Sequence, residues 1–135
     1  MANSVRDWMS TPVITILPEM SVSQALTLMR RRHIHSLVVD LTETSPTYGI
    51  ITTTDIRDKI VGQGRDPRSA AVREIMTSPI TVALPEWTIR EASLKMQELG
   101  VHHLPVSDER GTLIGMISAT DIFIAVEEAG WETGP

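Results

Sequence analysis

The sequence contains no cysteine among its 135 residues, which excludes disulfide bonds and thiolate metal sites. It also lacks any run of about 18 apolar residues, the length that spans a bilayer. The amino-terminal stretch MANSVRDWMS has no apolar segment typical of a signal peptide, and Ala2 replaces the glycine that N-myristoylation requires. These absences lead us to expect a cytoplasmic protein without a membrane partner.

Basic charge is also scarce, because 12 Lys and Arg residues stand against 17 Asp and Glu residues, for a net charge of −5. This balance argues against broad attraction to nucleic acid. No G-x-S-x-G elbow, phosphate-binding P-loop or metal triad occurs. We therefore expect no catalytic residues and no enzyme activity.

The chain repeats itself over nearly its whole length. The segment VRDWMSTPVITILPEMSVSQALTLM, from Val5, aligns with VREIMTSPITVALPEWTIREASLKM, from Val72, at a fixed offset of 72 − 5 = 67 residues. After Val39 the offset drops by one, which places a length difference in a surface loop. We expect a first repeat in residues 1–64 and a second in residues 65–135, joined by a linker at 62–69.

Each repeat predicts the element order strand, helix, strand, strand, helix. Ser21 with Gln24 and Thr88 with Glu91 have the spacing of capping boxes, which marks the start of each long helix. Two short β-branched runs follow each helix and predict a hairpin, with a type I turn at residues 108–111. A half of about 60 residues buries too little surface to be stable alone, so we expect one compact α+β domain with a shared core.

A hydroxyl-rich corner occurs in both repeats, as GIITTTDI from Gly49 and as GMISATDI from Gly115. In each copy an apolar strand ends at a hydroxyl residue and a helix is predicted to begin within the next few residues. The amino-terminal end of a helix carries unpaired N–H groups and partial positive charge, which favour phosphate. Thr54 and Thr120 add further hydroxyl donors.

The corner also supplies one carboxylate in each repeat, Asp55 and Asp121. A carboxylate accepts hydrogen bonds from the two neighbouring hydroxyls of a ribose, so the corner fits the sugar and phosphate of a nucleotide. The spacings Thr52-x-x-Asp55 and Ser118-x-x-Asp121 are equally those of capping boxes that only start a helix. Spacing alone leaves both interpretations open.

Three repeated features together resemble a known family: the MSTP and MTSP openings, the IHSLVV and VHHLPV strands, and the corner itself. In this order they resemble a pair of cystathionine-β-synthase (CBS) domains, the Bateman module, over roughly residues 5–126. The resemblance implies two pseudo-symmetric β-α-β-β-α repeats, each a small mixed three-stranded sheet with helices. It also implies clefts that bind AMP, ADP or ATP, with no cofactor required.

The resemblance further implies site residues in three groups. The ribose would contact Asp55 and Asp121, and ribose and phosphate would meet the hydroxyls of Thr52, Thr54, Ser118 and Thr120. Adenine would lie against Val13, Ile14, Ile80 and Thr81. Phosphate would meet His35, His102 and His103; Ser36 stands where a further basic residue is expected, and Arg57 is a candidate to compensate for it.

Other polar features favour ordinary structural roles. The four histidines have no carboxylate at a ligand-like spacing, so we expect no metal site. The run Arg30–Arg32 closes a helix, where cations complement the helix dipole. Trp131, in the tail AGWETGP, either packs on a partner or moves freely.

The favoured function is a regulatory sensor that binds an adenine nucleotide, forms a homodimer and acts on an unidentified regulated protein. One alternative is an interaction or dimerisation protein of the same type whose clefts stay empty. Another is a module for a different adenosyl ligand, such as S-adenosylmethionine. A nucleotide-processing enzyme is the weakest alternative.

Overall fold

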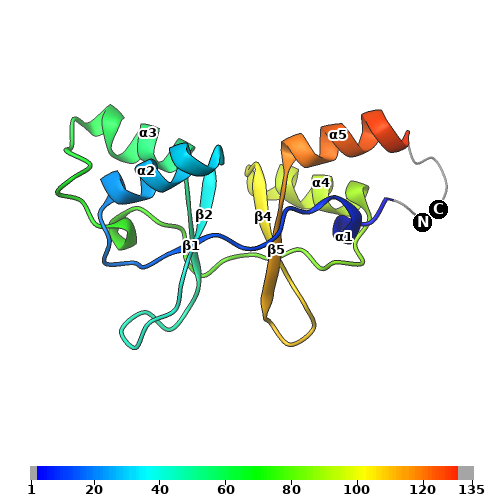
Figure 1. Ribbon diagram of the computed structural model, residues 1–135, viewed down its shortest axis with the longest axis horizontal. Coiled ribbons are helices and arrows are strands. Elements are labelled where there is room, and N and C mark those ends of the chain that lie inside the picture. Colours follow the sequence, from blue (N-terminus) through cyan, green and yellow to red (C-terminus); the bar gives the residue numbers. More distant parts are fainter. Residues whose placement is uncertain (1–2, 131–135) are drawn as a thin grey trace. The chain divides into compact units, whose positions relative to one another are not determined.

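The computed structural model describes residues 3–130, and Trp131 lies outside this range. Its α-helices are α1 (Val5–Trp8), α2 (Val22–Arg32), α3 (Thr53–Lys59), α4 (Ile89–Leu99) and α5 (Ala119–Ala129). Its strands are β1 (Thr15–Ile16), β2 (Ser36–Val39), β3 (Gly49–Thr52), β4 (His103–Ser107) and β5 (Leu113–Ser118). Two short 3-10 helices are η1 (Val61–Gln63) and η2 (Val72–Glu74), and Figure 1 labels the α-helices and most of the strands.

Packing divides the chain into two units, each treated by itself below. The first-repeat unit is Ile14–Ile80, and the second-repeat unit combines the described residues up to Val13 with those from Thr81 onward. The boundary predicted between residues 64 and 65 separates the sequence repeats, whereas packing places the opening segment of each repeat with the other repeat. Asn3, for example, accepts a hydrogen bond from the N–H of Ile89, with an N···O distance of 3.0 Å.

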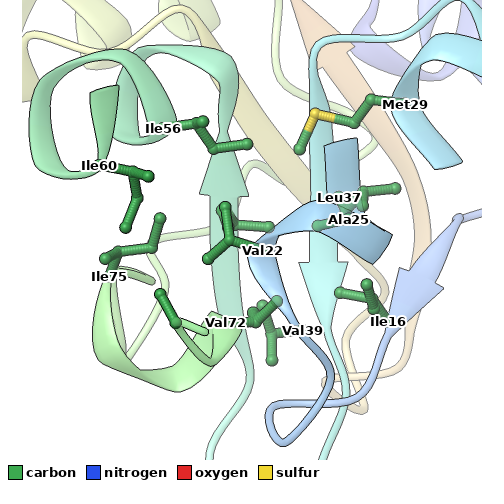
Figure 2. Close-up of a cluster of buried hydrophobic side chains, with 12 residues drawn as sticks. Ile16, Val22, Ala25, Met29, Leu37, Val39, Ile56, Ile60, Val72 and Ile75 are labelled. Carbon is green, nitrogen blue, oxygen red and sulfur yellow. The ribbon is translucent and has the colours of Figure 1, made fainter. Parts of the chain in front are cut away.

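The first-repeat unit contains the three-stranded mixed sheet that the resemblance implied. β1 pairs with β2 in parallel, and β2 pairs with β3 in an antiparallel register that places Ser36 opposite Thr52. Helices α2 and α3 lie together near one end of the strands, and the β2–β3 loop extends from the other end (Figure 1). Figure 2 shows side chains from α2, α3, β2 and η2 directed towards one another, among them the buried Met29, Ile56 and Val72.

The second-repeat unit has only two paired strands, β4 and β5, where three were expected. The third is reduced to a single parallel bridge between Ala83 and Val106, in the register of Ile16 and Val39. Pro105 explains this loss, because it stands where Val38 donates its N–H to the carbonyl of Ile14, and proline has no N–H to donate. The expected mixed α+β fold built from two repeats is confirmed, with this one strand shortened.

The buried hydrophobic residues form two clusters, one in each unit, rather than the single shared core that the chain length favours. Both predicted helix starts are confirmed, because Ser21 and Thr88 each accept a hydrogen bond from a backbone N–H three residues later. The predicted turn is also present, with the N–H of Gly111 bonded to the carbonyl of Asp108 at 3.0 Å. Local sequence signals therefore located the elements well.

Candidate functional site

The first corner joins β3 to α3 through a complete capping box. The hydroxyl of Thr52 accepts a hydrogen bond from the N–H of Asp55 at 3.1 Å. In return, Oδ2 of Asp55 accepts from the N–H of Thr52 at 2.9 Å and from its hydroxyl at 3.0 Å. The capping interpretation that the sequence left open is therefore satisfied here.

The other carboxylate oxygen of Asp55 faces a cation. Nζ of Lys59, one turn further along α3, lies 3.3 Å from Oδ1 of Asp55 and also donates to the carbonyl of Ile75 at 2.9 Å. The Asp55 side chain is 15% exposed and that of Lys59 is 47% exposed. Sequence reasoning missed Lys59, although its position four residues after an aspartate in a predicted helix is a recognised pairing signal.

The second corner joins β5 to α5 with the same box and fewer contacts. Oγ of Ser118 accepts from the N–H of Asp121 at 3.1 Å, and Oδ2 of Asp121 accepts from the N–H of Ser118 at 2.8 Å. Ala125, which is buried, occupies the position that corresponds to Lys59. Within residues 3–130 no hydrogen bond or ion pair reaches Oδ1 of Asp121. This oxygen is free to accept from a ligand.

The remaining hydroxyls and histidines lie close to the corners. Thr54 and Thr120 are exposed in the first turns of α3 and α5. The carbonyl of His35 accepts from the N–H of Thr53 at 3.0 Å, and that of His102 accepts from the N–H of Ala119 at 2.9 Å.

On β4, His103 lies directly across from Ser118. The predicted hydroxyl, carboxylate and histidine residues of each repeat are thus gathered at one strand-to-helix junction.

Two grooves open beside these junctions, at the ends of the long helices. In the first-repeat unit a groove of about 800 Å³ is lined by His35 and Thr53 together with Arg30, Arg31 and His33. The sequence assigned the arginines only to a helix end, and the structure adds that two of them border the groove beside His35. The corresponding groove of the second-repeat unit has a volume of about 310 Å³.

That second groove is mainly apolar, and His102, Val101 and Phe123 line it. Phe123 stands at the position of Arg57 in the first repeat. Arg57 is itself occupied with a neighbour, because its Nε lies 2.7 Å from Oδ1 of Asp58. This hydrogen bond raises the pKa of Arg57 and lowers that of Asp58. The predicted phosphate role of Arg57 would require this exposed pair to separate.

The four predicted adenine residues fall at the points where packing divides the chain. Ile14 and Ile80 belong to the first-repeat unit, whereas Val13 and Thr81 belong to the second-repeat unit. The carbonyl of Ile14 accepts from the N–H of Val38 at 3.1 Å, and its partly buried side chain packs against the core of the first-repeat unit. Their role in binding adenine stays a prediction.

Within residues 3–130, no group of three or more His, Asp or Glu side chains is placed so that it could hold a metal ion. Among the described helices, none has both the length and the apolar character needed to cross a bilayer.

A family model of the CBS domain matches the chain twice, at residues 5–62 and 72–128. The chain belongs to the CBS domain family. It is a CBS pair, a regulatory module in which the two matched segments correspond to the two sequence repeats.

Among curated relatives, an uncharacterized protein of Methanopyrus kandleri is 34% identical over 110 residues, which is 82% of this chain and 56% of that protein. The CBS pair thus spans about half the length of this relative. An inosine-5'-monophosphate dehydrogenase of Korarchaeum cryptofilum is 40% identical over 112 residues, 82% of this chain, yet the match covers only 22% of that enzyme.

Solved structures of CBS proteins have the same fold. A hexameric CBS-CP12 protein from bloom-forming cyanobacteria superimposes with a TM-score of 0.85 at 31% identity, covering 93% of this chain and 74% of that one. The CBS domain pair of protein MJ0100, solved with 5'-methylthioadenosine and S-adenosyl-L-methionine, gives a TM-score of 0.80 at 25% identity. That match covers 93% of this chain and 97% of the MJ0100 chain.

Proposed function

We propose that this CBS pair is a sensor that binds AMP, ADP or ATP at its aspartate corners and thereby changes its conformation or its affinity for a partner protein. The observation that carries the proposal is the second corner, where Asp121 caps α5 through Oδ2 while Oδ1 stays free. An aspartate can therefore start the helix and still accept the hydroxyls of a ribose. Capping and ligand binding are compatible at this junction.

Two further observations support an adenosyl ligand. The MJ0100 pair, which has the same fold, was solved with two adenosyl compounds. The histidines predicted to meet phosphate lie beside the corners. We propose adenine nucleotides as the ligands, and S-adenosylmethionine is the competing candidate that the test must include.

Calorimetric titration of the wild type with AMP, ADP, ATP and S-adenosylmethionine tests the proposal. A ligand at about 100 times its dissociation constant stabilises the fold by about 2.7 kcal/mol, which a melting experiment detects as well. Asp55→Ala and Asp121→Ala should each remove binding at one corner. Both also lose part of a helix cap, at a cost of about 1 kcal/mol, so their folding is checked by circular dichroism.

Glu128→Ala is the matched control, because Glu128 is an exposed carboxylate two turns beyond Asp121 on the same helix. This variant should bind like the wild type. Failure of the wild type to bind any of the four compounds would contradict the proposed function. Strong binding of S-adenosylmethionine alone would keep the corner as the site and change the ligand.

A second candidate function, dimerisation without a ligand, is favoured by the surface of α4, the residues just after it, and α5. Leu94 is 53% exposed, Val101 37% and Phe123 70%. The corresponding residues of the first repeat are Thr27, Ile34 and Arg57, so only the second repeat has both a large apolar residue on its long helix and an aromatic ring on the next.

We propose that this face of the second-repeat unit pairs with the same face of a second copy. The hexameric assembly of the cyanobacterial relative supports oligomerisation in general. Sedimentation equilibrium over a range of concentrations, with and without ATP, measures the oligomeric state. A dimer that never responds to any of the four compounds would favour the ligand-free interaction protein.

We propose, finally, that the chain itself catalyses no reaction on the nucleotide. The dehydrogenase relative supports this, because the CBS match covers only about a fifth of that enzyme. Analysis of products after incubation with ATP tests the proposal. Release of ADP, AMP or phosphate that disappears in Asp121→Ala would contradict it.

A further inference from the structure

The two aspartate corners have the same sequence pattern, but their carboxylates accept different numbers of contacts. At the first corner, two hydrogen bonds from Thr52 reach Oδ2 of Asp55, and the ammonium group of Lys59 lies 3.3 Å from Oδ1. At the second corner, one hydrogen bond from the N–H of Ser118 reaches Oδ2 of Asp121. The two carboxylates therefore differ in their capacity to accept a ligand.

This capacity can be counted. An ionised carboxylate offers about four acceptor positions. Hydrogen bonds fill two of them at Asp55 and the Lys59 ammonium covers a third, whereas at Asp121 one is filled. The neighbouring hydroxyls of a ribose need two positions. Asp121 can accept both while its cap stays intact, but Asp55 must first release a partner.

Lys59 is the partner of Asp55 that limits ligand binding at the first corner, because two groups hold its ammonium group in place. Its Nζ also donates to the carbonyl of Ile75 at 2.9 Å, a residue 16 positions away that follows η2. This second anchor fixes the ammonium beside Asp55 more firmly than a single contact on one helix would. The second repeat has no counterpart, because Ala125 is buried in its core at the same position.

We propose, resting on the proposed function, that Lys59 makes the two sites unequal: the adenosyl ligand occupies the Asp121 corner first and enters the Asp55 corner only when Lys59 is displaced. A ribose carries no charge, so it cannot replace the neutralising effect of Lys59 on a carboxylate that is mostly shielded from water. Lys59 is thus a specificity-determining residue that lowers affinity at one site. When the ammonium group leaves Asp55, the connection that Lys59 makes between Asp55 and the carbonyl of Ile75 is also broken.

Single-site variants test the order of occupancy. Asp55→Ala leaves the Asp121 corner, and Asp121→Ala leaves the Asp55 corner. In titrations with AMP, ADP, ATP and S-adenosylmethionine, the best ligand should bind Asp121→Ala at least about threefold more weakly than it binds Asp55→Ala, since a partly exposed ion pair must be broken. This comparison leaves Lys59 itself unchanged.

Lys59→Met then tests the cause, because methionine keeps an apolar stem of similar length and removes the charge. Placed in the Asp121→Ala background, it should tighten binding by about threefold, the part that breaking the ion pair had cost. In the Asp55→Ala background, Lys59→Met should leave the affinity for the ligand unchanged. Lys95→Met is the matched control, since Lys95 pairs with Glu98 on α4 and lies at neither corner.

The possible failures are distinguishable. Equal affinities of the two single-site variants would overturn the unequal sites while the proposed function stands. Weaker binding after Lys59→Met would overturn the competing role and show that Lys59 assists the ligand. Absence of binding to the wild type would overturn the proposed function, and this inference with it. If Lys59→Met does not fold, the comparison of Asp55→Ala with Asp121→Ala still decides the order of occupancy.

Discussion

Gly115, the first residue of the second corner motif, should not tolerate a side chain. A Cβ at this position would lie 2.9 Å from the carbonyl oxygen of Ser10 and 2.8 Å from Sδ of Met9. Ser10 is bonded to Met116 through both of its backbone groups, at 2.8 and 3.0 Å. The backbone at Ser10 therefore cannot withdraw from Gly115→Ala without stretching two hydrogen bonds.

The expected magnitude follows from two opposing effects. Overpacking of this kind costs about 1–3 kcal/mol. Replacing glycine by alanine in an ordinary strand conformation returns about 0.4–1 kcal/mol by restricting the unfolded chain. The free energy of unfolding should thus fall by about 1–2 kcal/mol, which lowers Tm by roughly 4–8 °C for a protein of this size.

Urea denaturation followed by circular dichroism measures this loss, and Gly49→Ala is the internal comparison. At Gly49 the nearest backbone oxygen, that of Thr77, is 3.2 Å from the added Cβ, and the closest atom, at 2.7 Å, is the side-chain sulfur of Met76. A flexible side chain moves more easily than backbone, so the loss at Gly49 should be smaller. A Gly115→Ala protein as stable as the wild type, or less affected than Gly49→Ala, would refute the reasoning.

Three further outcomes are expected. Phe123→Arg, which copies Arg57 of the first repeat, should prevent the proposed dimerisation in sedimentation equilibrium, and a variant that still dimerises would exclude this face. Thr88→Ala should lower the free energy of unfolding by about 1 kcal/mol in urea denaturation, because the N–H of Glu91 then loses the Thr88 hydroxyl that accepts its hydrogen bond. The N–H of Ala71 and then Arg65 lower the pKa of Glu74, so stability present above the ordinary glutamate pKa of about 4.3 should be lost as the pH falls through the lower folded value. A Glu74→Gln protein should lose that part of the pH dependence in urea titrations between pH 6 and 3, and an unchanged slope would show that Glu74 does not contribute.

Much of the fold could be predicted because its signals are local. The capping boxes at Ser21 and Thr88 act between residues three positions apart, and the turn after Asp108 closes within four residues. The shortening of the third strand of the second-repeat unit to a single bridge was not predicted. Its cause, the absent N–H of Pro105, matters only because that N–H would have faced another segment of the chain.

The candidate site was predicted in its composition but not in its electrostatics. The spacing in both corners predicted a cap or a ligand site, and both caps are present. The difference between the corners depends on Lys59, whose second anchor at Ile75 joins residues 16 positions apart. No periodicity in the sequence specifies a contact between a side chain and so distant a carbonyl.

The sequence by itself determined the repeat, the helix starts and the pair of acidic corners, since these depend on neighbouring residues and on hydrophobic spacing. Only the tertiary structure decided which repeat each opening segment joins. Val5 and Val72 are identical residues in equivalent positions, and both are fully buried, but Val5 packs in the second-repeat unit and Val72 in the first. Equivalent segments carry equivalent local signals, so the choice between them rests on long-range packing and backbone hydrogen bonds that no single stretch of sequence contains.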